Sequence, residues 1–327
     1  MSDKQTKRVV GVGSALIDIL INGTDDFIGK IGAVKGGMTL VDDAVIEKAL
    51  AMHDSDLSIV PGGSACNTVT GIGKLGGQAR FIGKCGNDEM GDLFKAGLKK
   101  NNVQPALAVS SSPTGRVLSV ITPDAQRSML TSLGASAEAD PREMTPDLFE
   151  NAAIVHLEGY LMFNPELIQS VLDQAVAAGA RVSLDLASFT IIDDHFDRLR
   201  KIVDDYVDIL MANEDEARAF TGCSDESQAM KILGQKADIA VLKVGERGSF
   251  ISHDGKIIPI EPAGSGGIID TTGAGDLWAG GFLYGLVNGL PIETCGAIGS
   301  RCGFEVCKTV GAVIPDDRWG KIRELVA

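Results

Sequence analysis

Short apolar runs recur along the chain, and most are separated from the next by a stretch with helical periodicity. Such runs are typical of strands covered on both faces, as in a parallel sheet. Alternation of strands and helices favours right-handed β-α-β units. We therefore predict an α/β fold with a doubly wound, mostly parallel central sheet flanked by helices. The expected strands are residues 9–12, 79–83, 152–157, 181–185, 208–211 and 239–243.

Two segments between these strands have a clear helical pattern. Residues 165–178 place apolar side chains on one helical face and are followed by Gly179, a typical stop signal. The segment after Asn213 is similar and ends at Gly222. Both are expected to be helices that cover the sheet.

Two regions interrupt the alternation, because they lack good helices and contain short alternating runs such as residues 115–122. We interpret these regions, 19–42 and 107–133, as strands of a small lid inserted in a single α/β domain that spans 1–327. The alternative is that they are ordinary edge hairpins.

The charge balance restricts the classes of partner. With 44 acidic and 30 basic residues the formal net charge is −14, which argues against nucleic acid and against an anionic membrane surface as partners. The polar N-terminus and the absence of a long apolar stretch predict a cytoplasmic protein. We expect a monomer or homodimer that binds a small molecule.

The strongest chemical signal is the run from Asp270 to Asp276, Asp-Thr-Thr-Gly-Ala-Gly-Asp, which precedes a helical pattern. Glycines at a helix start leave backbone N–H groups uncovered, and the helix dipole adds positive potential. The turn formed by Gly273, Ala274, Gly275 and Asp276 is therefore suited to hold a phosphoryl group while it is transferred. Asp276 at its edge is placed to accept a proton from an attacking hydroxyl. The alternative is a helix cap.

This run resembles the C-terminal signature of the ribokinase-like (PfkB) carbohydrate kinase family. The segment that begins Gly62-Gly63-Ser64-Ala65-Cys66-Asn67 is similar to the N-terminal signature of that family. Further similarities occur in family order over nearly the whole chain, at residues 11–18, 213–216 and 243–248. The resemblance implies an ATP-dependent kinase of the adenosine-kinase-like, nucleoside and sugar kinase branch.

The resemblance also implies a place for the phosphate acceptor. Asp18 follows an apolar strand and would accept hydrogen bonds from adjacent sugar hydroxyls. Gly62 and Gly63 would let the acceptor approach the backbone, and Asn67 would bind a further hydroxyl. Arg127, in the expected lid, would fold over the phosphoryl charge. The alternatives are turn capping for Asp18, helix capping for Asn67 and a solvent-facing strand position for Arg127.

The nucleotide and its ions are assigned in the same way. Asn213 and Glu216 correspond to an Asn-x-x-Glu motif that organises Mg²⁺ through water, with a solvated helix start as the alternative. The residues that would flank ATP are Lys243, Gly245, Gly248 and Thr271, with an ordinary surface lysine as the alternative for Lys243. Asp270 and Thr272 match positions at which some family members bind a monovalent cation, so a K⁺ requirement is a further hypothesis.

Two other functions are compatible with parts of the sequence. A nicotinamide-dependent dehydrogenase is suggested by Gly11 and Gly13 after the first strand, but Leu16 stands where the third glycine of that motif belongs. A non-catalytic relative of the kinases is the second alternative, and the intact Asp276 turn weighs against it. The acceptor stays open between sugars and nucleosides. Ser14 and Leu161 depart from the asparagine and the aromatic residue typical of adenosine kinases, which weighs against adenosine itself.

Overall fold

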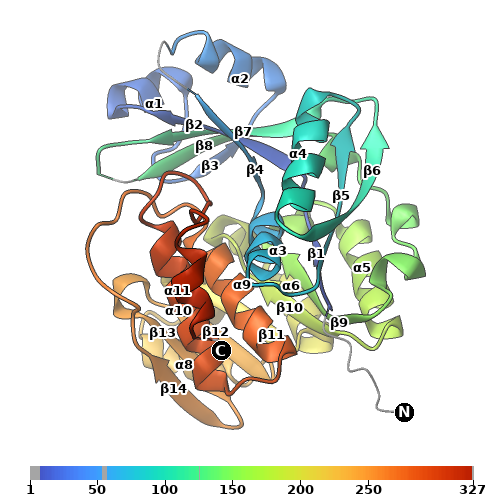
Figure 1. Cartoon of the computed structure of the whole chain (residues 1–327), viewed down its shortest axis with the longest axis vertical. Helices are drawn as coiled ribbons and strands as arrows, with labels where there is room; N and C mark the ends of the chain where they lie inside the picture. Colours follow the sequence, from blue (N-terminus) through green and yellow to red (C-terminus); the bar gives the residue numbers. More distant parts are fainter. Residues whose placement is uncertain (1–7, 54–56, 125, 326–327) are drawn as a thin grey trace.

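The computed structural model describes residues 8–53, 57–124 and 126–325 (Figure 1). Nine of the described strands form a large sheet in the spatial order β14-β13-β12-β11-β10-β9-β1-β5-β6. Neighbouring strands from β6 to β12 run parallel, whereas β13 and β14 are antiparallel. The strands are β1 (Arg8–Val12), β5 (Ala79–Gly86), β6 (Val103–Ser110), β9 (Ala152–Glu158), β10 (Arg181–Asp185), β11 (Ile209–Asn213), β12 (Ile239–Lys243), β13 (Ser249–His253) and β14 (Lys256–Ile260).

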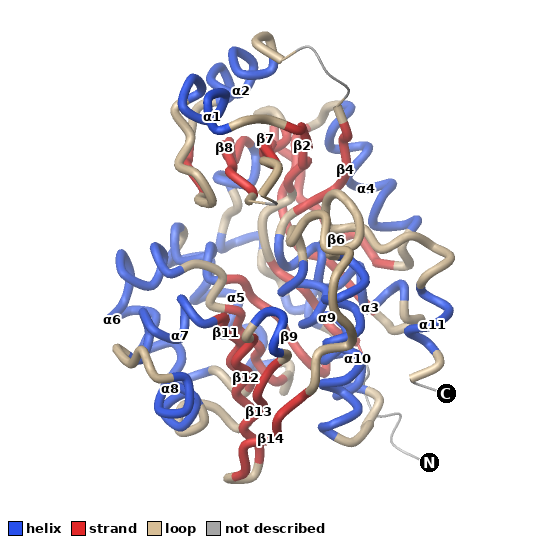
Figure 2. The backbone as a smooth tube through the Cα atoms, turned by 90° about the vertical axis from the view of Figure 1, so that its left-hand side faces the viewer, coloured by secondary structure: helices blue, strands red, loops and turns tan. Residues whose placement is uncertain are grey.

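Helices cover both faces of this sheet, as Figure 2 shows. Alternate residues of β1 point to opposite faces, so Val10 and Val12 belong to one core and Val9 to the other. The first core is closed by α5 (Pro165–Ala177), α6 (Phe189–Tyr206), α7 (Glu214–Thr221) and α8 (Glu226–Leu233). The second is closed by α3 (Ser64–Lys74), α4 (Glu89–Lys100), α9 (Ala274–Val287) and α10 (Ile292–Val306), with α11 (Trp319–Arg323) packed on α10. The predicted fold class is confirmed.

A second sheet of five described strands, in the order β3-β8-β7-β2-β4, lies at one end of the molecule (Figure 1). Its outer face packs on α1 (Asp25–Ile31) and α2 (Asp43–Leu50) through a small apolar core that includes Ile19, Ile46 and Leu118. Its inner face carries the alternate residues, among them Asp18 and Met129, toward the large sheet. The strands are β2 (Leu16–Asn22), β3 (Met38–Leu40), β4 (Ser58–Gly62), β7 (Thr114–Ile121) and β8 (Arg127–Gly134).

This small sheet overlaps the two segments in which the lid was expected. Residues 19–42 supply most of β2 with α1 and β3, and residues 107–133 supply β7 and most of β8. Residues 107–110 instead continue β6 of the large sheet, and β4 adds a strand that the sequence pattern did not indicate. Helix α1 was also unexpected, because seven residues are too few to display a helical period. That the sheet acts as a lid on a single domain stays a proposal.

Among the described residues, no helix is both long enough and apolar enough to cross a membrane.

Candidate active site

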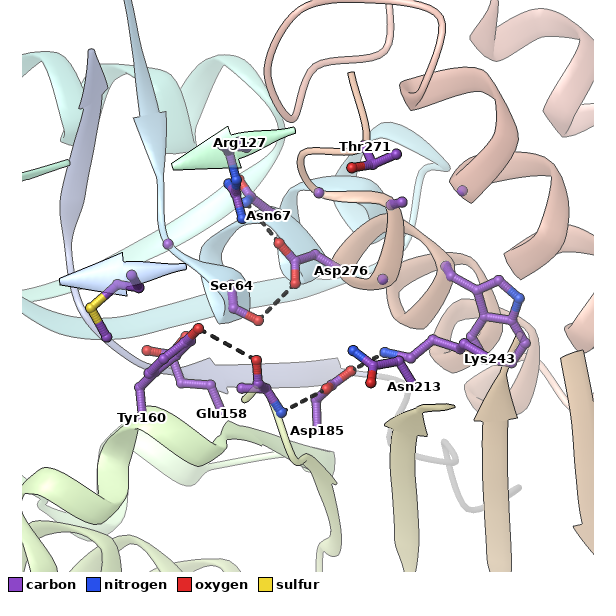
Figure 3. A pocket seen from close by; sticks show the side chains of 18 of the residues that line it. Ser64, Asn67, Arg127, Glu158, Tyr160, Asp185, Asn213, Lys243, Thr271 and Asp276 are labelled. Carbon is purple, nitrogen blue, oxygen red and sulfur yellow. Dashed lines mark hydrogen bonds and ion pairs between the residues drawn. The ribbon is translucent and has the colours of Figure 1, made fainter. Parts of the chain in front are cut away.

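A cleft of about 790 Å³ lies between the small sheet and the carboxyl ends of the parallel strands. Strands β10, β11 and β12 end at this edge with Asp185, Asn213 and Lys243, all of which line the cleft. Parallel strands end on the same side of a sheet, so side chains from distant parts of the chain meet there. The helix starts of α3 and α9 complete the wall (Figure 3).

Asp276 lies in the first turn of α9 and points across the cleft toward α3 (Figure 3). Its Oδ1 atom accepts a hydrogen bond from Ser64 Oγ at 2.8 Å, and its Oδ2 atom accepts one from Asn67 Nδ2 at 2.9 Å. Burial raises the pKa of Asp276, and these two hydrogen bonds oppose the rise. The carboxylate is therefore held in one orientation by neutral donors, and it is a stronger proton acceptor than an exposed aspartate.

The turn before α9 has the conformation that its glycines permit. Gly273 adopts φ 72°, and a methyl group there would come within 2.5 Å of the Ala312 Cβ atom. Leu277 N donates to Gly273 O at 2.8 Å, which closes the first helical turn. The N–H groups of Gly275 and Asp276 have no partner inside a helix that begins here. The turn can thus present N–H donors to an anion in the cleft.

Asp18 and Gly62 lie side by side on adjacent strands of the small sheet. Asp18 pairs in register with Val60, and a Cβ on Gly62 would fall 2.3 Å from the Asp18 Cγ atom. Gly62 therefore does not line the cleft but leaves the space that the Asp18 carboxylate occupies. Burial raises the pKa of Asp18 to about 6, and the positive charge of Arg127 opposes the rise. Arg127 itself lines the cleft from β8.

Asn213 and Glu216 form a capping box at the start of α7. Asn213 Oδ1 accepts from Glu216 N at 2.9 Å, while Glu216 accepts from Asn213 N at 2.8 Å and from Asn213 Nδ2 at 2.7 Å. Burial and the negative charge of Asp185 raise the pKa of Glu216. The alternative of a solvated helix start does not hold for Glu216, because this side chain is only 4% exposed. The carboxylates of Glu216 and Asp185 lie close together, and Asn213 holds the Glu216 carboxylate in one orientation. Such a pair suits a divalent cation that is held through water.

The remaining residues predicted to contact the nucleotide also line the cleft. Lys243 ends β12, and Gly245 and Gly248 belong to the turn that follows it. Thr271 lies beside the glycine turn of α9. Gly63 and the members of that turn, Gly273, Ala274 and Gly275, line the same cleft.

Asp270 and Thr272 do not line the cleft. Both are buried beneath the turn, where Asp270 Oδ1 accepts from Thr272 N at 2.9 Å and from Thr272 Oγ1 at 2.7 Å. Asp270 Oδ2 accepts from Gly311 N at 2.8 Å. These bonds fix the glycine turn to the loop after α10.

Sequence reasoning missed Glu158, a carboxylate that is 2% exposed and lines the cleft. Its oxygens accept from Ala65 N at 2.8 Å and from Ser14 N at 3.2 Å, so it joins the start of α3 to the β1–β2 connection. Burial raises its pKa to about 7, against those two hydrogen bonds. The available signal was an acidic residue directly after an apolar strand. The same signal marks Asp185, which was also missed.

The raised pKa values predict how stability depends on pH. A carboxyl group whose pKa is higher in the folded state than in the unfolded chain stabilises the folded state. Its contribution to the free energy of unfolding is full below the unfolded pKa and is lost as the pH rises through the folded pKa. For Asp18 and Glu158 the fall lies between about pH 4 and 7. The pKa values of Asp124 and Asp140 are lowered to about 2, chiefly by hydrogen bonds from Lys35 and Arg142, so these two groups titrate below this pH window.

We expect the unfolding midpoint of the protein to decrease between pH 5 and 8, and Glu158→Gln to make that decrease shallower. Thermal unfolding followed by circular dichroism across this range measures both. Asp140→Asn is the matched control, because the Asp140 carboxyl group has already lost its proton below pH 5. The unfolding midpoint of this variant should depend on pH with the same slope as that of the wild type. An unchanged slope for Glu158→Gln would contradict the assignment of Glu158 as a buried titrating group.

Comparison with known proteins agrees with this architecture. The pfkB family carbohydrate kinase model matches residues 26–319. Adenosine kinase of Saccharomyces cerevisiae is 27% identical over 96% of this chain and 98% of its own length. The crystal structure of adenosine kinase from Sinorhizobium meliloti superimposes with a TM-score of 0.91 at 28% identity, covering 98% of this chain and 100% of that one.

A probable sugar kinase from Rhizobium etli is equally similar, with a TM-score of 0.92 at 28% identity and 98% coverage of both chains. The match to the kinase family covers strands β3, β4, β7 and β8 of the small sheet and the Asp276 turn, and it leaves the nicotinamide-dependent dehydrogenase without support. The chain therefore belongs to the pfkB family of carbohydrate kinases.

Proposed function

We propose that this kinase transfers the γ-phosphoryl group of ATP to a primary hydroxyl of a nucleoside or sugar. The observation that carries the proposal is the position of Asp276. Its carboxylate lies at the N-terminus of α9, is oriented by Ser64 and Asn67, and shares one cleft with Asp18. A base and an anion-binding turn at the same helix start are what an in-line phosphoryl transfer requires.

Each side of the cleft has a distinct role in this proposal. Asp18, with Gly63 and Asn67, binds the acceptor so that its hydroxyl faces Asp276. The N–H groups of Gly275 and Asp276 bind the transferring phosphoryl group. Asp276 removes the hydroxyl proton as the new bond to phosphorus forms. Arg127 approaches the phosphoryl group from the small sheet and offsets its negative charge.

ATP would lie along the edge formed by Asn213, Lys243, Gly245, Gly248 and Thr271. Glu216, oriented by Asn213, fits a Mg²⁺ ion held through water, because the surrounding carboxylates leave this end of the cleft negatively charged. When bound with ATP, Mg²⁺ neutralises phosphate charge. Asp270 and Thr272 are the residues that we propose for a K⁺ ion, with their polar atoms beneath the glycine turn.

The acceptor side of the cleft favours a nucleoside over a simple sugar. Beyond Asp18 the wall is largely apolar, and a simple sugar, which carries a hydroxyl group on most of its carbons, would cover little of it. A nucleobase has a flat face that can bury against such a wall. Leu161 lies in this wall between Tyr160 and Phe163, so aromatic rings are available although the position itself is aliphatic. The apolar residues are Leu16, Met38, Val117, Met129, Leu133, Leu161 and Phe163.

A screen of ATP consumption tests the proposed reaction. The purified protein with MgATP should consume ATP in the presence of at least one nucleoside, with a kcat/KM at least tenfold above that for ribose or fructose. The Asp276→Asn variant, purified in the same way, controls for contaminating kinases. Faster turnover of a sugar would reassign the acceptor class, and no turnover with any nucleoside or sugar would favour a non-catalytic relative.

A further inference from the structure

Lys243 forms a buried ion pair beside the glycine turn. Its Nζ atom lies 2.6 Å from Asp185 Oδ2, and the two side chains are 13% and 6% exposed. Both residues end strands of the large sheet, β12 and β10, with β11 between them. Figure 3 shows the lysine side chain extending to Asp185 along the floor of the cleft.

The ammonium group also lies against the turn that would hold the phosphoryl group. A Cβ atom on Gly275 would stand 3.0 Å from Lys243 Nζ. Glycine at this position therefore leaves the ammonium group and the backbone N–H groups of the turn adjacent to one another. A single anion in the cleft could contact both.

Stability does not explain a charge at this place. Burying an ion pair removes two hydration shells, and an apolar pair of similar volume is often as stable. Burial lowers the pKa of Lys243, but the negative charges of Asp185 and Glu216 outweigh it and the pKa is raised overall. The amine thus stays protonated at neutral pH, surrounded by carboxylates that attract it in the absence of nucleotide.

We infer that Lys243 is a catalytic residue that leaves Asp185 for the γ-phosphoryl group of the nucleotide and stays on its oxygens during transfer. This inference rests on the kinase function proposed above. In the transfer, the bond from the γ-phosphorus to its bridging oxygen breaks and ADP leaves with the electron pair. The acceptor oxygen bonds to phosphorus, and its proton passes to Asp276. Lys243 neither gains nor loses a proton; it balances charge on the oxygens that do not react.

Asp185 is a positioning residue in this scheme. Its carboxylate holds the ammonium group at the phosphate end before ATP binds, 2.6 Å away. Replacement by asparagine would keep a hydrogen-bond acceptor of the same size and remove the charge. We expect that change to affect turnover less than loss of the lysine.

The test compares Lys243→Met, Asp185→Asn, their double variant, Lys243→Ala and one control in the reaction that the ATP-consumption screen identifies. Lys243→Met removes the ammonium group and leaves the buried Asp185 carboxylate without its counter-ion, although Oδ1 still accepts from Ala187 N. Lys243→Met/Asp185→Asn is therefore included to restore charge balance. Lys84→Met is the matched control. Lys84 also pairs with a carboxylate, that of Glu143, at 2.7 Å and is 11% exposed, but it does not line the cleft. Each variant is measured for kcat, for ATP binding by calorimetry and for thermal stability.

We expect kcat to fall roughly 10- to 150-fold in both Lys243 variants, the range for one lost charged hydrogen bond, with ATP affinity reduced less than kcat. Lys243→Ala should regain part of its kcat when ethylamine or propylamine is added, a rescue that a purely structural role would not give. Lys84→Met should lose stability only. A double variant with kcat within threefold of the wild type would overturn the inference. An inactive wild type would instead refute the proposed kinase function.

Discussion

Replacement of Asp276 by asparagine should reduce kcat by roughly 10²- to 10⁴-fold, the usual contribution of a general base. The asparagine side chain has nearly the same shape and occupies the same place between Ser64 and Asn67, but it cannot take the proton of the acceptor. ATP binding should change little, because the N–H groups of the turn remain. Steady-state kinetics with isothermal titration of ATP would separate the two quantities.

Ser64→Ala is the control for the hydrogen bonds of Asp276. It removes the donor 2.8 Å from Oδ1 and leaves the carboxylate and the Asn67 bond in place. We expect a loss in kcat of about tenfold or less, the equivalent of one neutral hydrogen bond. If Ser64→Ala were as damaging as Asp276→Asn, orientation and not proton removal would be the main contribution of this side chain.

Replacement of Gly273 by alanine should reduce kcat by roughly 10²- to 10³-fold, the loss seen when one donor of an anion hole is displaced. The added methyl group would meet the Ala312 Cβ atom at 2.5 Å, so the turn has to move and its N–H groups change direction. The left-handed backbone, φ 72°, would cost about 1–2 kcal/mol of stability in addition.

Gly289→Ala separates the two effects. Gly289 follows the same helix, α9, and has φ 70°, yet a methyl group there meets nothing within 4 Å. It should therefore lose a similar amount of stability in a denaturant titration while kcat stays at the wild-type value. Equal loss of activity in both variants would show that backbone strain in α9, and not displacement of the anion-binding turn, reduces turnover.

Local features of the site were predictable from the sequence, because their spacing is fixed by the helix. Asn213 and Glu216 are three residues apart, and the capping box they form follows from that spacing. The glycine turn before α9 is also local, since Gly273 adopts the conformation that glycine favours. Both could be placed at helix starts without knowledge of the fold.

Contacts between distant segments were not predictable in the same way. The partners of Asp276, Ser64 and Asn67, lie 212 and 209 residues away, and only the packing of α3 on α9 brings them together. The pairing of Lys243 with Asp185 depends on the strand order β10-β11-β12. The raised pKa of Glu158 depends on burial, which is a property of the folded chain. Sequence pattern gives the residue types at the strand ends, but the strand order decides which of them meet.

The small sheet is connected to the large sheet at the proposed acceptor site itself. Strand β4 ends at Gly62 and continues through Gly63 directly into α3, which carries Ser64 and Asn67. Strand β2, which carries Asp18, follows β1 after a connection of three residues that donates to Glu158 through Ser14 N. A rotation of the small sheet would therefore displace the groups proposed to bind the acceptor and the donors to Asp276 together.

This connection has a thermodynamic consequence. Any ligand that favours one orientation of the small sheet must alter the affinity for the acceptor, and the acceptor must alter the affinity for that ligand by the same factor. Cooperativity between nucleotide and acceptor would thus need no contact between the two molecules. Its size would be set by how much more tightly each ligand binds one orientation of the small sheet than another. Substitutions at the Gly62–Gly63 joint would therefore change cooperativity even where each separate binding site is intact.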